Sequence, residues 1–304
     1  SGSGKSSLIK EVLKPAINNK LGFYEKEDNN YKDIKITVDN IKKLEFINQN
    51  PLGKSSRSNP ITYIKAYDDI RTLFANQSLS KARKYKTGMF SFNVDGGRCE
   101  ECKGEGEIRV EMQFMADVHL KCEECDGKRF KKEILEIKFS ENNIADILAM
   151  SVNQAIDFFI KNDKKIIANK IQPLKDVGLG YIKLGQSSNT LSGGEAQRTK
   201  IASFLSKGNT QNKMLFIFDE PTTGLHFNDI NKLLKSFYSL IERGHSIICI
   251  EHNLDVIKCA DWIIDLGPEG GNKGGEVLFS GTPEDIIKEK TSYTGKFLKP
   301  KLTV

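Results

Sequence analysis

Residues 191–198, Leu-Ser-Gly-Gly-Glu-Ala-Gln-Arg, combine side chains and backbone suited to binding an anion. Ser192, Gly193 and Gly194 form a turn at the start of a predicted helix, which presents unhindered backbone N–H groups and the positive end of the helix dipole. We interpret the anion as the γ-phosphate of a nucleotide held by a different domain. A glycine-rich turn that only caps a helix gives the same pattern, so this interpretation depends on the motifs that follow.

The beginning of the chain matches the end of a phosphate-binding loop, and an apolar-periodic run that predicts a helix follows it. The glycines let backbone amides wrap the phosphates of ATP, Lys5 reaches the β and γ oxygens, and the Ser6 hydroxyl binds Mg²⁺. The first glycine of the motif would precede residue 1, so we expect a longer protein. A flexible Gly-Ser linker would explain only the first four residues. The predicted cofactor-binding residues are Gly2, Ser3, Gly4, Lys5, Ser6 and Ser7.

Two adjacent carboxylates follow a predicted buried strand. Residues 214–218 are five consecutive apolar residues, a pattern typical of a parallel strand buried on both faces, and Asp219 and Glu220 come directly after it. The carboxyl end of a strand is where an open α/β sheet places its ligand chemistry. We predict that Asp219 holds Mg²⁺ through water and that Glu220 activates the attacking water as general base.

Two further polar residues end apolar segments in the same way. Residues 246–250 predict another buried strand, and His252 just beyond it is the candidate sensor of the γ-phosphate. An isolated histidine at a strand end is usually structural, but the order of the motifs along the chain favours the functional interpretation. Gln49 ends the segment around Phe46 and is predicted to contact Mg²⁺ or water. The predicted catalytic residues are therefore Glu220, His252 and Gln49.

Together these motifs resemble the ATP-binding cassette superfamily. The resemblance implies an α/β fold with a P-loop NTPase core and an inserted helical signature subdomain, and it implies ATP and Mg²⁺ as cofactors. It also implies that two cassettes pair head to tail, so that each nucleotide lies between one phosphate loop and the partner's signature. The signature of this chain then serves a site whose lysine lies elsewhere.

Four cysteines lie in two C-x2-C pairs, Cys99 with Cys102 and Cys122 with Cys125, separated by nineteen residues. Two such knuckles can supply four thiolates to a tetrahedral Zn²⁺, and this spacing is a strong zinc signal. Disulfides are the alternative, but the sequence shows neither a secretory signal nor a transmembrane run. His119 lies between the pairs and could compete as a ligand. Alternating apolar residues predict a small β-hairpin or ribbon here, namely Ile108, Val110, Met112 and Phe114.

Lysines and arginines surround this zinc module, and the chain has a formal net charge of +6. A run of charges is usually a solvated face, but beside a zinc ribbon it favours contact with a phosphate backbone. Four thiolates around one Zn²⁺ leave a net negative charge, so nearby cations also have a structural role. Glutamates inside each knuckle disfavour DNA on the metal loops themselves. The basic residues are Lys81, Arg83, Lys84, Lys86, Arg98, Arg109, Lys121, Lys128, Arg129, Lys131 and Lys132.

The zinc module lies within the 187 residues that separate Lys5 from the signature residue Ser192. A cassette stretched in this way, with a zinc module in the gap, resembles the UvrA family, the damage-sensing ATPases of bacterial nucleotide excision repair. The resemblance extends over nearly the whole chain and corresponds to the second, C-terminal cassette of that family. Matching segments include residues 53–63, 90–93, 96–99, 115–118, 191–198, 219–226 and 265–271.

The UvrA resemblance implies an ATPase that binds and hydrolyses ATP while it scans duplex DNA for damage. It implies a UvrA homodimer, an N-terminal cassette in the same full-length chain, and UvrB as the subunit loaded next. In this family the C-terminal zinc module helps to distinguish damaged from intact DNA. The predicted domains are the first part of the cassette at 1–88, a zinc-binding insertion at 89–135, a helical signature subdomain at 136–190 and the second part of the cassette at 191–304.

The composition agrees with a soluble enzyme of this kind. A hydrophobic fraction of 38% with 28% charged residues predicts a cytoplasmic protein with a substantial core and no membrane association. Three alternatives stay open: a nucleotide-binding subunit of a membrane transporter, a UvrA-like paralogue in drug resistance, and a non-catalytic zinc-dependent DNA-binding module. A transporter subunit has no reason to carry the cysteine pairs, and the intact Lys5, Asp219 and His252 argue against a decayed ATP site.

Overall fold

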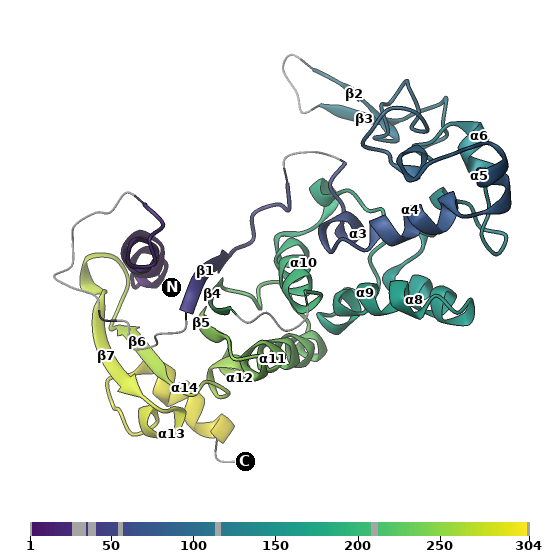
Figure 1. Cartoon of the computed structure of the whole chain (residues 1–304). Coiled ribbons are helices and arrows are strands. Elements are labelled where there is room, and N and C mark those ends of the chain that lie inside the picture. The colour runs from purple at the N-terminus through teal and green to yellow at the C-terminus, as the bar shows by residue number, and fades with distance from the viewer. Residues whose placement is uncertain are drawn as a thin grey trace. The chain divides into compact units, whose positions relative to one another are not determined.

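The computed structural model describes residues 2–25, 35, 41–53, 57–112, 117–207 and 212–302 (Figure 1). Contacts within the chain divide it into two compact units. Unit 1 comprises Ser1–Gln49 and Lys207–Val304, and unit 2 comprises Asn50–Ser206. The four predicted domains, with limits at 88, 135 and 190, stay a prediction. By its contacts, the helix that follows the signature belongs to the same unit as the cysteine pairs.

Unit 1 contains a parallel sheet in which β4 (Lys213–Asp219) lies between β1 (Ile41–Ile47) and β5 (Ser246–Ile250). Residues 215–218 of the central strand are all buried, as expected for an apolar run in the middle of a parallel sheet. The strands predicted at 214–218 and 246–250 are confirmed. Because parallel strands end at the same edge of a sheet, the segments that follow all three strands start at one edge.

One helical segment leads directly from the glycine-rich start of the chain onto this sheet. Ile17, on this segment, packs with Leu44, Leu215 and Ile217 of the sheet. The apolar core therefore fixes the helix whose first residue is Lys5. The helical elements of unit 1 up to β6 are α1 (Lys5–Ser7), the π-helical stretch η1 (Leu8–Leu13), α2 (Lys14–Lys20), α11 (Phe227–Glu242) and α12 (Leu254–Ile257).

A second, antiparallel pair of strands completes the described part of unit 1. Its own small core consists of Ile263, Ile286 and Leu298. The glycine-rich stretch between the two strands contains one short 3-10 turn. The elements are β6 (Ile263–Gly267), η4 (Gly271–Lys273), β7 (Glu276–Gly281), α13 (Pro283–Ile286) and α14 (Tyr293–Leu302).

His245 makes the stability of unit 1 dependent on pH. Its side chain is buried, its Nδ1 accepts a hydrogen bond from the Met214 N–H at 3.1 Å, and its ring meets the Phe216 ring edge-on. Burial, with a smaller contribution from Arg243, lowers the pKa of His245. The unfolded chain therefore takes up this proton at a higher pH than the folded chain does. The neutral His245 side chain therefore makes its full contribution to the free energy of unfolding above about pH 6.5, the ordinary histidine value. That contribution is lost as the pH falls toward the lowered pKa of the folded state.

We expect the free energy of unfolding to decrease between pH 7.5 and pH 5.5, and His245→Gln to remove part of that decrease. The neutral amide cannot take up the proton. Denaturant unfolding followed at a series of pH values measures both slopes. Equal slopes in the wild type and the variant would show that another group carries the dependence.

The first half of unit 2 surrounds an aromatic core beside the cysteine pairs. The Phe92 ring lies 5.0 Å from the Tyr67 ring and 6.3 Å from the Phe130 ring, measured between centroids, and all three residues are buried. The predicted hairpin is confirmed as the antiparallel pair β2–β3; Phe114 lies outside the described residues. The elements are α3 (Pro60–Tyr63), α4 (Tyr67–Ala75), α5 (Ser78–Ala82), η2 (Thr87–Phe90), β2 (Glu107–Val110), β3 (Val118–Lys121) and α6 (Lys132–Leu135).

The second half of unit 2 is helical and leads into the signature. Ser151 and Asn143 each cap a helix by accepting hydrogen bonds from first-turn N–H groups. Pro173 lies inside a helix that continues to Asp176 and its ring is buried, although an interior proline removes one N–H donor and crowds the preceding turn. The elements are α7 (Ile144–Ala149), α8 (Val152–Lys161), α9 (Lys165–Asp176), η3 (Ser188–Thr190) and α10 (Gly193–Leu205).

None of the helices in the described part of the chain combines the length and apolar character needed to span a membrane.

Candidate nucleotide site and zinc centre

The phosphate-loop residues form a tight turn at the start of α1. Gly2 and Gly4 have φ angles of 82° and 85°, in the left-handed region that glycine adopts without strain. Gly4 precedes the helix, and the Lys5 ammonium donates a hydrogen bond to the Ser3 hydroxyl at 2.9 Å. The turn therefore presents N–H groups and an ammonium group at one helix end, a combination that suits phosphate oxygens.

The glycine-rich loop at residues 270–275 packs against this turn, a contact that the sequence pattern did not predict. The Gly271 N–H donates to the Gly2 carbonyl at 3.1 Å. A Cβ added at Gly274 would lie 2.2 Å from the Glu269 carbonyl oxygen and 3.2 Å from Ser3 Cα. Only glycine fits at Gly274, chiefly because of the Glu269 carbonyl in the same loop, whereas Gly271 and Gly275 have φ angles of 62° and 88° in the region that favours glycine.

Ser6 and Asp219, which are far apart in sequence, meet at the carboxyl end of β4. The Ser6 hydroxyl donates to Asp219 Oδ1 at 3.3 Å, and the Lys10 ammonium lies 2.5 Å from Asp219 Oδ2. A hydroxyl and a carboxylate are hard oxygen ligands of the kind Mg²⁺ prefers, so these residues fit that ion. Lys10 was missed in the sequence. It lies one helical turn beyond Ser6 on the same face of the helix, which was the available signal.

Gln49 and His252, two of the residues predicted to be catalytic, each lie within hydrogen-bonding reach of the third, Glu220, in unit 1. His252 Nε2 is 3.3 Å from Glu220 Oε1, and Gln49 Nε2 donates to the Glu220 carbonyl oxygen at 3.4 Å. The Glu220 and His252 side chains are each nearly half exposed, at 44% and 45%. The Glu220 carboxylate is thus accessible to water at the sheet edge, directly beside Asp219.

Glu220 has a φ of 48°, which is unusual for a residue other than glycine. Its N–H donates to the Ile250 carbonyl at 2.9 Å, which ties it to the end of β5. Glu251, the next residue of that segment, accepts backbone N–H groups with both carboxylate oxygens. The sequence pattern assigned no role to Glu251, although it directly precedes His252.

The signature residues lie in unit 2 at the start of α10. Ser192 caps this helix: its hydroxyl accepts from the Glu195 N–H at 3.3 Å, and Glu195 Oε2 accepts from the Ser192 N–H at 2.8 Å. The Tyr181 hydroxyl donates to the other oxygen of Glu195 at 2.6 Å. Gly193 and Gly194 occupy the first helical positions, where backbone N–H groups have no partner within a helix. This geometry is that of a helix N-terminus able to receive an anion.

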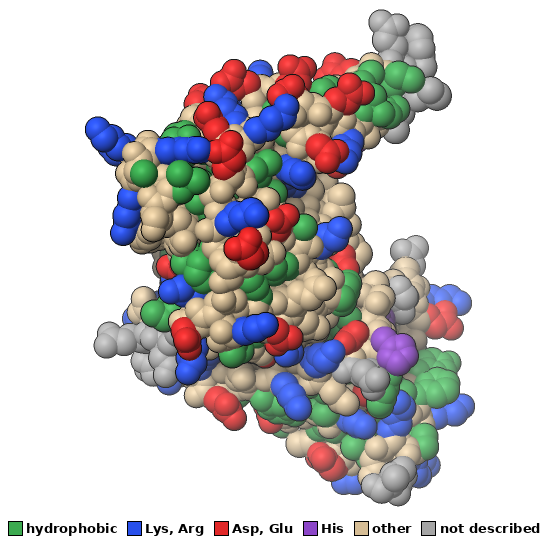
Figure 2. Space-filling model, turned by 90° about the vertical axis from the view of Figure 1, so that its right-hand side faces the viewer, with side chains coloured by type: hydrophobic (Ala, Val, Ile, Leu, Met, Phe, Trp, Pro, Cys, Tyr) green, Lys and Arg blue, Asp and Glu red, His purple; other side chains and the backbone are tan. Residues whose placement is uncertain are grey.

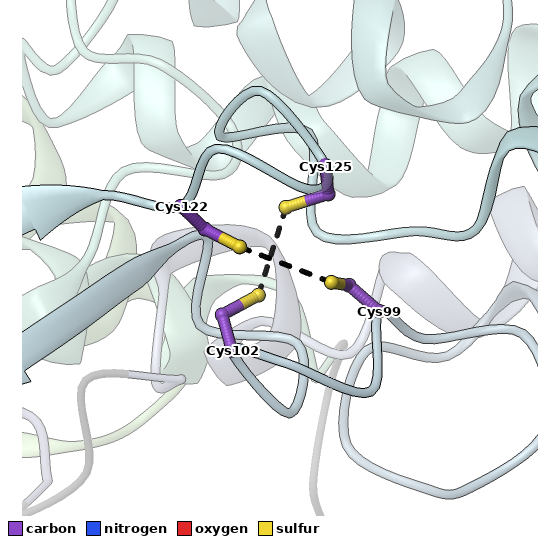
Figure 3. Close-up of side chains that lie close together, drawn as sticks. All are labelled: Cys99, Cys102, Cys122 and Cys125. Carbon is purple, nitrogen blue, oxygen red and sulfur yellow. Dashed lines mark hydrogen bonds between the residues drawn. The ribbon is translucent and has the colours of Figure 1, made fainter.

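The four cysteines of unit 2 form one buried cluster (Figure 3). Cys99 Sγ lies 3.9 Å from Cys122 Sγ, Cys102 Sγ lies 3.6 Å from Cys125 Sγ, and all four sulfurs lie within 4.8 Å of one another. Zinc–sulfur bonds of about 2.3 Å in a tetrahedron require sulfurs about 3.8 Å apart, so the cluster fits Zn²⁺. None of the six cysteines forms a disulfide.

The surroundings of the cysteines agree with a thiolate site. The Gly106 N–H donates to Cys102 Sγ at 3.2 Å. Gly104 has a φ of 85°, and a Cβ there would lie 2.1 Å from the Phe92 carbonyl oxygen, so the knuckle turns only with glycine. His119 is not part of the cluster; its Nδ1 lies 3.4 Å from a carboxylate oxygen of Glu107 on the neighbouring strand.

Many of the basic side chains predicted to contact a phosphate backbone pair with acids inside unit 2. Arg83 pairs with Glu136 at 2.5 Å and Arg98 with Asp95 at 2.6 Å, and Arg129 is mostly buried against the Phe92 ring. Figure 2 shows Lys and Arg interspersed with Asp and Glu over the face that it displays. Others form the pairs Arg109–Asp117, Lys121–Asp126, Lys131–Glu100 and Lys132–Glu124, whereas Lys81, Lys84, Lys86 and Lys128 are exposed.

Comparisons with known proteins agree with one another over nearly the whole chain. UvrABC system protein A of Clostridium tetani is 55% identical over 302 residues, which are 99% of this chain and 32% of that protein. Its counterpart in Listeria monocytogenes is 53% identical over 301 residues, again 99% of this chain and 31% of that protein. The chain thus spans about a third of the length of the curated relatives it matches. No protein-family model matches it.

A solved structure of a UvrA protein has the same fold as this chain. The crystal structure of UvrA2 from Deinococcus radiodurans superimposes with a TM-score of 0.88 at 40% sequence identity. The match covers 99% of this chain and 36% of that chain.

Proposed function

We infer the function of this chain from the premise that it belongs to the UvrA family, as a segment of about a third of the length of its relatives. We propose that it is part of an ATPase that recognises DNA damage in bacterial nucleotide excision repair. The observation that carries the ATPase part is the meeting of four distant chain segments at one edge of the β1-β4-β5 sheet, with Ser6 and Asp219 at its centre.

In this proposal the residues of the sheet edge divide the work of ATP hydrolysis. The amides of the phosphate loop and Lys5 bind the β- and γ-phosphates, and Ser6 and Asp219 hold Mg²⁺. The magnesium ion supplies positive charge that offsets the charge of the phosphates. Glu220 accepts the proton of the attacking water, and Gln49 and His252 orient that water and the γ-phosphate.

We further propose that Ser192, Gly193 and Gly194 bind the γ-phosphate of a nucleotide held by another cassette. Their first-turn N–H groups and the helix dipole favour a negative charge at that point. The other cassette is the N-terminal one of the same full-length chain or one in a second copy of the protein. This arrangement makes hydrolysis dependent on two cassettes coming together.

The cysteine cluster distinguishes this proposal from the alternative of a nucleotide-binding subunit of a membrane transporter. Four buried cysteines at the spacing of a tetrahedral site have no part in the chemistry of ATP, and bound zinc would stabilise the β2–β3 ribbon. We propose that this module contributes to the binding of duplex DNA and to the distinction between damaged and intact duplex. UvrB is the proposed recipient of the DNA, and the proposed location is the cytoplasm.

We expect the full-length protein to bind a duplex that carries a bulky lesion more tightly than the same duplex without it, and ATP to change this preference. The measurement is a titration of both duplexes at one fixed salt concentration, with and without ATP, because phosphate contacts depend strongly on salt. Equal affinity for both duplexes under all conditions would contradict damage recognition. That result would not bear on the proposed ATPase activity, which is tested by measuring the turnover of ATP.

A further inference from the structure

Glu251 connects the two loops that carry Glu220 and His252. Its Oε1 accepts the Thr222 N–H at 2.9 Å. Its Oε2 accepts the N–H groups of His252 at 2.8 Å and Asn253 at 2.9 Å. Three hydrogen bonds to one ionised carboxylate are each stronger than bonds between neutral groups. One side chain thus ties the loop after β4 to the loop after β5.

The loops need such a tie because the conformation at Glu220 is strained. A residue other than glycine with a φ of 48° is in an unfavourable backbone conformation and persists only where its surroundings hold it. The Glu220 N–H is held by the Ile250 carbonyl, and its own carbonyl oxygen accepts from the Thr223 N–H and the Thr223 hydroxyl. Pro221 and Thr222 lie between Glu220 and Thr223, and Glu251 holds the second of them by accepting the Thr222 N–H.

We propose that Glu251 is a positioning residue that sets the 3.3 Å separation between the Glu220 carboxylate and the His252 imidazole. It does so through the backbone of Thr222 on one side and of His252 on the other. Both oxygens of Glu251 accept backbone amides, so the proposed role is to hold the two loops, and the proton transfer is left to Glu220. This inference rests on the proposed ATPase function and adds a residue to the machinery of that site.

The chemistry of the side chain makes the role specific to a carboxylate. Glutamine has one acceptor oxygen, and its NH₂ group would face backbone N–H donors. Alanine has no acceptor and leaves three amides without partners. Aspartate keeps both oxygens but is shorter by one methylene, so it can restore the bonds only with a shift of the backbone.

The test compares Glu251→Gln and Glu251→Ala with the wild type in the full-length protein. We expect kcat for ATP hydrolysis to fall about tenfold to a hundredfold, because a displacement near 1 Å at reacting groups has effects of that size. The KM for ATP should stay within about twofold, since the phosphate loop is untouched. Glu251→Asp should recover part of the lost kcat. Glu242→Gln, which changes an exposed carboxylate at the end of α11, is the matched control and should behave as wild type.

A double variant distinguishes positioning from general loss of structure. If Glu251 acts through Glu220, then adding Glu251→Gln to Glu220→Gln should lower kcat much less than Glu251→Gln does alone, because one of the two groups being positioned is already gone. Wild-type kcat in both Glu251→Gln and Glu251→Ala would overturn the inference. So would losses that multiply in the double variant or that appear in KM alone. Near-normal turnover of Glu220→Gln itself would instead count against the proposed role of Glu220 in the ATPase.

Discussion

Replacing Glu220 by glutamine is expected to slow ATP hydrolysis about a hundredfold or more while ATP still binds. Removal of a general base has an effect of that size, and the amide keeps the size of the side chain but cannot accept the proton. The contacts of Glu220 that involve its backbone, with Ile250 and Gln49, do not depend on the carboxylate. Ser6 and Asp219, the proposed magnesium ligands, are unchanged. The measurements are steady-state turnover and equilibrium binding of ATP by the full-length variant.

The matched control for Glu220→Gln is again Glu242→Gln, which makes the same chemical change at an exposed residue at the end of α11. It should hydrolyse ATP at the wild-type rate. Turnover of Glu220→Gln within a few-fold of wild type would show that the general base has been assigned to the wrong residue. Loss of ATP binding in that variant would show that the carboxylate holds the nucleotide rather than activating water.

Replacing Cys122 by serine is expected to abolish zinc binding by unit 2 and to loosen the β2–β3 ribbon. Cys122 is fully buried and its sulfur lies 3.9 Å from that of Cys99. Serine would place a protonated hydroxyl where the metal requires a thiolate, and structural zinc is coupled to local folding. Zinc analysis of the purified protein and hydrogen exchange of the ribbon amides measure the two effects.

The sheet of unit 1 has its own apolar core, so ATP hydrolysis should persist in Cys122→Ser. Cys259→Ser is the matched control, because the Cys259 thiol lies outside the cysteine cluster and donates to the Asp255 carbonyl, which a hydroxyl can also do. The preference of the full-length variant for damaged over intact duplex should change, whereas overall affinity should fall only partly, since phosphate contacts carry no sequence information. A variant that lacks zinc yet keeps the wild-type preference would show the module to be purely structural.

The sequence shows which basic residues surround the zinc module but not which of them pair with acidic residues. Lysines and arginines near a zinc ribbon predict a surface for phosphate, and that prediction stays untested. The structure adds that Arg83, Arg98 and Arg109 each pair with a carboxylate of unit 2. A count of charges along a chain cannot reveal which of them neutralise each other, because the partners of Arg83 and Lys131 are 53 and 31 residues away.

The sequence by itself determined the features whose cause is local. Five apolar residues in a row predicted β4, because a strand buried on both faces needs them. The spacing of Cys99, Cys102, Cys122 and Cys125 predicted one cluster, because two residues between cysteines let both sulfurs of a knuckle face the same ion. The resemblance of the ordered motifs identified the family, which the comparisons support over 99% of the chain.

Only the tertiary structure decided which side chains complete the site. Lys10 reaches Asp219 across more than two hundred residues of sequence, and the Glu251 carboxylate joins the loop at Thr222 to the loop at His252. The alignment of the strands brings these groups together, and it depends on the burial of many apolar side chains at once rather than on any short pattern. A local pattern specifies an element and its chemistry, whereas the packing of the sheet specifies which elements' ends meet.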